Sequence, residues 1–290
     1  MVTRADYREI ASGEWHMLAL PGSWSGELQK QVLEIVVAQA ATHHPQTVEV
    51  HSSTAGAQRC FYLKVFHRMT LSAALKDGLR QSRAWRFWRQ GLALTAAGFN
   101  VPLTIALGGA RGWHIVKREF VVTDKIDGAT VPLFLRREFR GGAPAVALKR
   151  ERIRRLARLI RQFHDGGFVH GDLVASNIFV ATGASDDVEF YFMDNDRTQH
   201  YPSWLPQPLW KRNLIQLNRL PLPGISLQDR LRFLHAYLNV RRLSAVDRRL
   251  ARWLEGKTRR RRRECDGVDA TGSFRMLMRW SPETTWAEDN

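Results

Sequence analysis

The sequence has 290 residues, enough for two lobes with a sizeable core but short for three domains. Hydrophobic residues make up 44% and charged residues 25%, which excludes disordered, collagen-like and disulfide-scaffold proteins. Lysine and arginine total 44 against 28 acidic residues, so the net charge of +16 predicts anionic partners. Cys60 and Cys265 lie far apart without a CxxC spacing, which argues against a disulfide framework or a structural zinc site.

The beginning of the chain carries no sign of membrane insertion. Charged residues interrupt residues 1–20, so this segment lacks the apolar region of a signal peptide. The most apolar stretch, residues 32–41, contains Glu34 and is much shorter than the roughly 18 apolar residues that a spanning helix needs. The sequence therefore predicts a cytosolic protein whose contact with a membrane is peripheral.

Hydrophobic periodicity in the first part of the chain alternates between helical and extended patterns. The predicted elements are helices over 26–41 and 79–97, a hairpin formed by 47–52 and 59–66, and strands over 113–116 and 119–123. A turn-rich connector follows at 124–128, where the composition changes. We therefore expect an α+β N-terminal lobe over residues 1–124.

Beyond residue 124 the pattern becomes mainly helical, because apolar residues recur at 3.6-residue spacing. The predicted elements are helices over 132–139, 146–164, 210–220 and 227–254, and short strands over 178–181 and 189–193. A basic block occupies 257–263, and the periodicity fades after it. We expect a helical C-terminal lobe over 125–256 and a basic, weakly packed tail over 257–290.

Two short motifs in the second half carry the chemistry. The segment Phe168–Val180 contains the pattern H-x-D-L-x-x-x-N, with its aspartate at Asp172 and its asparagine at Asn177. Seventeen residues after Asn177, a second apolar strand ends on Asp194. Two polar groups at a loop and a third at a strand end are the arrangement that phosphoryl transfer with a magnesium ion requires.

Each of these residue types has a distinct role in that chemistry. Asp172 can accept the proton of an incoming hydroxyl, which makes it the predicted catalytic base. Asn177 and Asp194 offer the hard oxygen atoms that Mg²⁺ prefers, and they are the predicted metal ligands. Lys64, on the strand 61–66, is the predicted cation for the α- and β-phosphates of ATP.

Taken singly, these residues also have structural explanations. Asp172 and Asn177 fit a capped polar turn, Asp194 fits a strand end, and Lys64 fits a surface lysine. Their order along the chain and their separations favour the catalytic interpretation.

The motifs resemble those of the protein-kinase-like superfamily, whose catalytic loop and metal-binding aspartate they match. The His170-Gly171-Asp172 triplet is similar to that of small-molecule kinases in this superfamily, and no Ala-Pro-Glu element follows Asp194. Together with 82–85, 97–102 and 212–219, the motifs resemble the lipopolysaccharide kinase family, which includes Kdo and heptose kinases of Gram-negative bacteria. The resemblance covers roughly residues 59–238.

This resemblance implies a bilobal protein-kinase-like fold, with a small β-rich N-lobe and a mainly helical C-lobe. It also implies ATP as donor, Mg²⁺, and a lipid A-linked sugar hydroxyl of the lipopolysaccharide core as acceptor. The expected location is the cytoplasmic face of the inner membrane, whose anionic surface suits a basic protein. No specific nucleic acid is expected.

The sequence departs from the kinase template in two places. From Gly78 to Arg118 it has no acidic residue, whereas the template pairs the strand lysine with a glutamate on the following helix. Lys64 then pairs directly with Asp194, which we favour, or with Glu34 or Asp77. The loop before the lysine strand offers only Gly56, so a tight glycine wrap around phosphate is not available and weak nucleotide binding is expected.

Two alternatives remain open from the sequence. One is a kinase-like phosphotransferase for another small molecule or for a protein, because the catalytic residues would be the same. The other is a non-catalytic basic binding protein on a kinase scaffold, which the absent helix glutamate favours and the motif residues disfavour.

Overall fold

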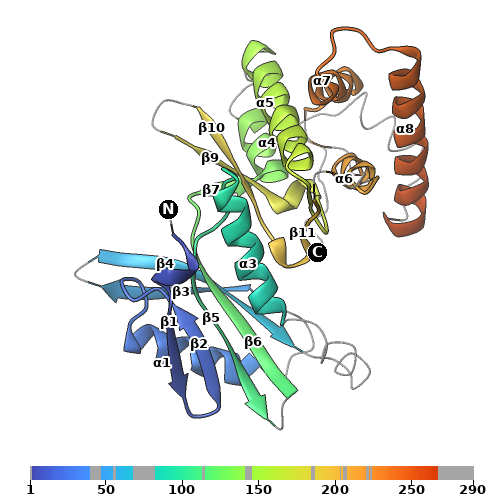
Figure 1. Cartoon of the computed structure of the whole chain (residues 1–290). Helices are drawn as coiled ribbons and strands as arrows, with labels where there is room; N and C mark the ends of the chain where they lie inside the picture. Colours follow the sequence, from blue (N-terminus) through green and yellow to red (C-terminus); the bar gives the residue numbers. More distant parts are fainter. Residues whose placement is uncertain are drawn as a thin grey trace. The chain divides into compact units, whose positions relative to one another are not determined.

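A computed structural model of the chain describes residues 2–39, 47–54, 57–67, 82–112, 115–140, 146–183, 187–202, 204, 208–219, 222 and 224–266. The chain forms two units, drawn in Figure 1: residues 1–126 with 192–197, and residues 127–191 with those from 198 onward. The change of unit after residue 126 lies close to the expected boundary at 124. The return of 192–197 to the first unit was not expected from the sequence.

The first unit contains a six-stranded antiparallel sheet with the strand order β1-β2-β5-β6-β4-β3. Its strands are β1 (Arg8–Ser12), β2 (Trp15–Ala19), β3 (Thr47–Thr54), β4 (Ala57–His67), β5 (Thr104–Gly112) and β6 (Ile115–Asp124). Its helices are the short η1 (Arg4–Asp6), α1 (Gly26–Ala38), α3 (Arg83–Ala96) and the short η4 (Asn195–Arg197). The predicted hairpin is confirmed as β3 and β4.

Alternation along β4 explains how the sheet presents Lys64. Phe61, Leu63 and Val65 are buried in the core of this unit, and Tyr62 and Lys64 between them are only half-buried. Successive side chains of a strand point to opposite faces, so Lys64 leaves the sheet on the face opposite Leu63. Neighbouring apolar residues thus fix the direction of a charged one.

One part of the predicted sheet is wrong. The strands expected over 113–116 and 119–123 form a single strand, β6, and its partner β5 was not predicted. Gly108 of β5 shows why the sequence signal is weak, since a Cβ there would lie 2.6 Å from Met17 and 2.8 Å from Phe120 side-chain atoms. Close packing requires glycine at a position where a strand pattern would show a large apolar residue.

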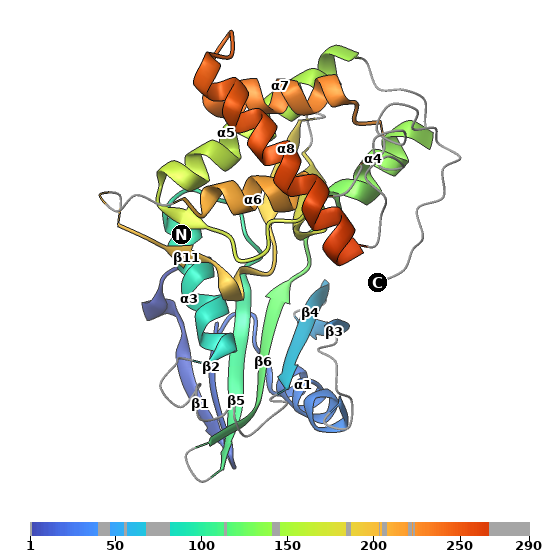
Figure 2. The ribbon, with the colours of Figure 1, turned by 90° about the vertical axis from the view of Figure 1, so that its right-hand side faces the viewer.

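The second unit is mainly helical and contains two small sheets, with orders β10-β9-β7 and β11-β8. Its helices are α4 (Val131–Arg140), α5 (Val146–Asp165), the short η3 (Ala175–Asn177), α6 (Trp210–Leu217), α7 (Leu227–Leu238) and α8 (Ala245–Asp266). Its strands are β7 (Gly128–Thr130), β8 (Phe168–Val169), β9 (Ile178–Thr182), β10 (Val188–Phe192) and β11 (Gln199–His200). Helix α5 packs on α7, and α6 packs on α8 (Figure 2).

The end of the described chain corrects two expectations. The helix predicted over 227–254 is two helices, because Asn239 adopts a left-handed conformation with φ of 53° and ends α7. Helix α8 continues through the basic block to Asp266, with Thr258 and Arg262 at 0% and 1% exposure. The prediction of a weakly packed tail from residue 257 onward is therefore wrong for residues 257–266. Residues 267–290 lie outside the described part of the chain.

Among the described residues, none of the helices combines the length and the apolar character that crossing a bilayer requires.

Candidate functional site

Lys64 and Asp194 meet in the first unit. The Lys64 ammonium forms an ion pair with Oδ1 of Asp194, 130 residues later in the chain. Their side chains are 20% and 46% exposed, so both remain accessible to a ligand. The prediction that Lys64 pairs directly with Asp194 is confirmed. Of the two alternatives, Glu34 is exposed on α1 and forms no hydrogen bond or ion pair with Lys64 within the described part of the chain, and Asp77 lies outside the described residues.

The loop that carries Asp194 is fixed by its own backbone and by helix α3. Asp194 has a left-handed φ of 55° and lies two residues after the end of β10. The next residue, Asn195, donates from Nδ2 to the carbonyl of Phe192 over 2.9 Å. Asp196 is buried, and its Oδ2 accepts hydrogen bonds from Nε and Nη2 of Arg83 at 3.1 and 2.9 Å. A cation of α3 thus holds the aspartate loop.

Glu119 holds the start of α3 and was missed by the sequence reasoning. It is 5% exposed, and its Oε2 accepts the backbone N–H of Ala84 over 2.9 Å. Ser82 Oγ accepts the N–H of Trp85 at the same end. A carboxylate is favourable there because the first turn of a helix has unpaired N–H groups and a partial positive charge. These contacts fix the turn from which Arg83 extends.

Asp172 and Asn177 meet in the second unit, in the loop between β8 and β9. Asn177 donates from Nδ2 to the backbone carbonyl of Asp172 over 2.9 Å. The N–H of Asp172 donates to Nδ1 of His170 over 3.0 Å. The amide oxygen of Asn177 makes no hydrogen bond within the described residues, so this oxygen is available to a ligand.

Two amides of α6 support this loop, and sequence reasoning gave neither a role. Gln216 donates from Nε2 to Oδ1 of Asp172 over 3.0 Å, and its Oε1 accepts the N–H of Leu173 at 3.3 Å. Asn213 is fully buried and binds both backbone groups of His170, accepting from the N–H at 3.0 Å and donating to the carbonyl at 2.6 Å. Their i, i+3 spacing puts both amides on one face of the helix, and this was the sequence feature that could have indicated a shared role.

A buried histidine continues this network away from the loop. His164 lies 3.1 Å by Nε2 from Oδ1 of Asn213 and 2.9 Å by Nδ1 from the hydroxyl of Tyr237. Burial lowers the pKa of His164 to about 4 and raises the pKa of Tyr237, so both are neutral near pH 7. Because Asn213 Oδ1 can only accept, His164 donates from Nε2 and accepts from Tyr237. This role is structural.

The four predicted site residues therefore form two pairs, Lys64 with Asp194 in one unit and Asp172 with Asn177 in the other. The donor set suits magnesium, which prefers carboxylate and amide oxygens. Asp194 has an exposed carboxylate, and Asn177 has an available amide oxygen. The residues fit the predicted ion by chemistry.

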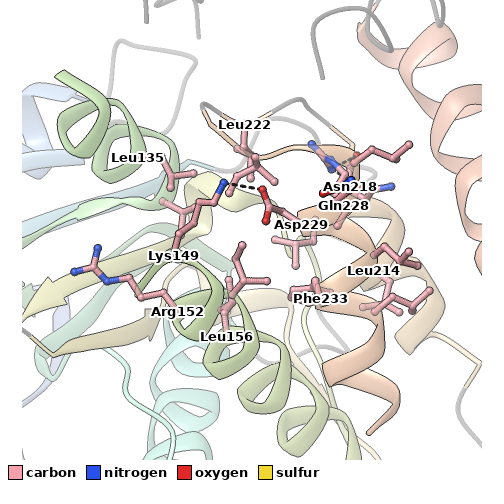
Figure 3. A pocket seen from close by; sticks show the side chains of 18 of the residues that line it. Leu135, Lys149, Arg152, Leu156, Leu214, Asn218, Leu222, Gln228, Asp229 and Phe233 are labelled. Atoms are coloured by element: carbon pink, nitrogen blue, oxygen red, sulfur yellow. Dashed lines mark hydrogen bonds and ion pairs between the residues drawn. The ribbon is translucent and has the colours of Figure 1, made fainter. Parts of the chain in front are cut away.

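A cavity of about 730 Å³ lies in the second unit among α4, α5, α6, α7 and α8 (Figure 3). Its wall is mostly apolar and includes Leu135, Leu156, Leu214 and Phe233. An ion pair between Lys149 and Asp229, 2.9 Å long, forms one polar part of the wall. The size falls within the range of about 300–1,000 Å³ that is typical of small-molecule pockets.

Comparisons with known proteins identify a protein family and a related solved structure. Residues 26–237 match the model described as the lipopolysaccharide kinase (Kdo/WaaP) family, a segment that contains all four predicted site residues. A solved structure of WaaP in complex with acyl carrier protein matches with a TM-score of 0.56 and 21% identity. The match covers 76% of this chain and 86% of that chain, and it confirms the predicted α+β kinase-like fold. No curated protein matches the sequence.

Proposed function

The chain belongs to the lipopolysaccharide kinase (Kdo/WaaP) family and is therefore an ATP-using kinase, and we propose that its acceptor is a Kdo or heptose hydroxyl of the lipopolysaccharide inner core. The observation that carries the site assignment is the ion pair between Lys64 and Asp194. These residues were predicted to serve the same nucleotide from separate motifs, and they meet although 130 residues separate them.

In the proposed reaction, Asp172 is the general base. Gln216 occupies Oδ1 of its carboxylate, which leaves Oδ2 for the acceptor hydroxyl. Asp172 accepts the hydroxyl proton, the sugar oxygen bonds to the γ-phosphorus, and the bond to the β-phosphate oxygen breaks to release ADP. The Gln216 contact orients the carboxylate before the acceptor arrives.

The remaining residues position the donor. We assign Lys64 to the α- and β-phosphates, with Asp194 and Asn177 as magnesium ligands. When bound, magnesium supplies charge neutralisation between the phosphates. The ion pair with Asp194 supports this role for Lys64, because it keeps the ammonium beside the carboxylate on which the metal would bind.

The net charge of +16 supports an anionic acceptor at the cytoplasmic face of the inner membrane. The basic face of α5 offers less unpaired positive charge to an anionic partner than its composition suggests. Arg154 and Arg158 pair with Glu151, and Arg155 pairs with Asp187. The location is therefore proposed from overall charge and family, and peripheral binding would weaken as salt concentration rises.

The decisive experiment incubates radiolabelled ATP with a Kdo-bearing lipid A precursor and, in parallel, with heptosylated core, and then locates the transferred phosphate. Label on a Kdo or heptose hydroxyl, lost in Asp172→Ala and in Asp194→Ala, is the expected result. Asp187→Ala is the matched control, because this exposed aspartate lies outside the site. Magnesium-dependent ATP binding without transfer to either acceptor would reject the acceptor assignment.

The apolar cavity favours a partner in addition to the sugar acceptor. We propose that an acyl carrier protein inserts its acyl chain there, since the solved WaaP is in complex with an acyl carrier protein. Leu214 lines the cavity, while its neighbours Asn213 and Gln216 on α6 hold the catalytic loop. Filling the cavity would therefore stabilise the helix that supports Asp172.

Thermal unfolding with acylated and unacylated carrier protein tests this partner. We expect the acylated form to raise the melting temperature and the unacylated form to have little effect. Ala251→Trp, which fills the cavity from α8, should remove the shift. Val246→Trp on the same helix is the control, because Val246 is 69% exposed and does not line the cavity. Equal shifts with both carrier forms would contradict insertion of the acyl chain.

A further inference from the structure

We propose that Glu49, His51 and Cys60 form a binding site for a thiophilic divalent cation of the Zn²⁺ class on the β3–β4 hairpin. One ligand atom from each residue lies within 4.8 Å of the other two. His51 and Cys60 are directly opposite in the antiparallel register, and Glu49 is two residues before His51. Alternation therefore puts all three on one face of the hairpin. No CxxC spacing marks this cluster, because its members come from two strands.

The carboxylate of Glu49 is already oriented for such a role. Its Oε1 accepts hydrogen bonds from the hydroxyl of Tyr62 at 2.9 Å and from the ammonium of Lys125 at 3.0 Å. Its Oε2 faces Sγ of Cys60 at 3.9 Å. Metal-binding carboxylates are commonly held in this way by hydrogen bonds on the other oxygen.

The spacing suits tetrahedral coordination. Zinc binds sulfur at about 2.3 Å and nitrogen or oxygen at about 2.0 Å, so neighbouring ligand atoms are roughly 3.3–3.6 Å apart. The ligand atoms, which lie within 4.8 Å of one another, would need to approach by up to about 1.5 Å, which side-chain rotation on an exposed face permits. Glu49 and His51 are exposed and Cys60 is half-buried, so the fourth position is open to water.

Binding changes one bond at the thiol. The Cys60 proton leaves to solvent as the sulfur–metal bond forms, so binding weakens at low pH. Lys125 opposes the cation by its charge, but it contacts Oε1 and its ion pair with Glu49 is exposed, so this cost is small. The mixed sulfur, nitrogen and oxygen set selects against Mg²⁺, which prefers oxygen ligands alone. The site is thus separate from the proposed nucleotide metal.

Titration of the full-length chain with Co²⁺, followed by absorption and displacement with Zn²⁺, tests the proposal. We expect one Co²⁺ per chain, with a sulfur-to-cobalt charge-transfer band that Zn²⁺ removes. Cys60→Ala should abolish the band, and His51→Ala should weaken binding at least tenfold. Cys265→Ala is the matched control, since Cys265 is the other cysteine of the chain.

Two outcomes would overturn the proposal: absence of the charge-transfer band in the wild-type chain, or a band that survives Cys60→Ala. Tyr62→Phe is a second variant that removes only the hydroxyl on Glu49 Oε1. It should weaken Co²⁺ binding several-fold while leaving the band in place. Unchanged affinity would contradict the proposal that the Tyr62 hydrogen bond to Oε1 orients Glu49 to bind the metal through Oε2. ATP is absent from every sample, so the result does not depend on the kinase activity.

Discussion

Gln216 donates a hydrogen bond from Nε2 to Oδ1 of Asp172 over 3.0 Å, so a helix 44 residues away orients the predicted catalytic carboxylate. We expect Gln216→Ala to lower kcat about tenfold or more and to leave the KM for ATP nearly unchanged, because one orienting hydrogen bond contributes about 1.5–3 kcal/mol when its partner is charged. Steady-state kinetics of phosphate transfer measure both constants.

Gln216→Glu separates orientation from general structural support. A second carboxylate beside Asp172 raises the pKa of the base, so the acidic limb of the pH–rate profile should move to higher pH. Unaltered pH dependence in this variant would show that Gln216 does not act through Asp172.

The contact between Arg83 and Asp196 predicts an effect on nucleotide binding. Asp196 is buried and receives two hydrogen bonds from Arg83, so Arg83→Ala leaves an uncompensated carboxylate beside the Asp194 loop. We expect affinity for magnesium-ATP, measured by calorimetry, to fall about tenfold or more. Arg83→Lys should restore part of it, and Arg89→Ala, an exposed arginine on the same helix, should change little.

The direct pairing of Lys64 with Asp194 predicts which carboxylates are dispensable. Glu34→Ala and Asp77→Ala should leave nucleotide affinity nearly intact, because Lys64 already has its partner. Lys64→Ala should lower the same affinity strongly, since the phosphates lose their cation. A large loss of nucleotide affinity in Glu34→Ala or in Asp77→Ala, measured by nucleotide titration, would mean that the ion pair between Lys64 and Asp194 is rearranged when ATP binds.

The depressed pKa of His164 predicts a pH-dependent stability. Its pKa is about 4 in the folded chain and about 6.5 when exposed, so the unfolded chain binds the extra proton between these values. The stabilisation is present in full above pH 6.5 and is lost as pH falls towards 4. The total is on the order of 3 kcal/mol. Unfolding by denaturant across this pH range measures it.

The variant His164→Gln isolates the contribution of this histidine from that of acidic groups. Its free energy of unfolding should vary less between pH 7 and pH 4 than that of the wild-type chain. The same substitution at His16, which is exposed on β2, is the control. Parallel stability profiles for the wild type and His164→Gln would contradict the predicted burial effect.

Sequence periodicity predicted the helices better than the strands. The stripe Leu28, Val32 and Val36 marks α1 because each residue faces the core of its unit. Strand β5 shows no such pattern, since Gly108 is there to admit Met17 and Phe120. A position selected for the absence of a side chain carries no hydrophobic signal, so its strand could not be predicted from local composition.

Residues of the candidate site could be proposed from the sequence where they lie within a local motif. Asp172 and Asn177 lie in one loop, and Asp194 follows a recognisable apolar strand. Residues that act through tertiary contacts, such as Asn213 and Gln216, were not assigned roles because amides on a helix have many structural uses. Their function depends on which loop they contact, and a single sequence does not contain that information.

Hydrogen bonds between α8 and the C-terminal end of α6 determine when this part of the chain can fold during synthesis. Arg262 of α8 donates from Nη2 to the carbonyl of Asn218 over 2.7 Å and also bonds the carbonyl of Arg219. The helix that carries Gln216 is thus secured by a residue synthesised about 90 positions after Asp172. A nascent chain therefore completes the support of the loop that carries Asp172 only after the arginine-rich segment has emerged from the ribosome.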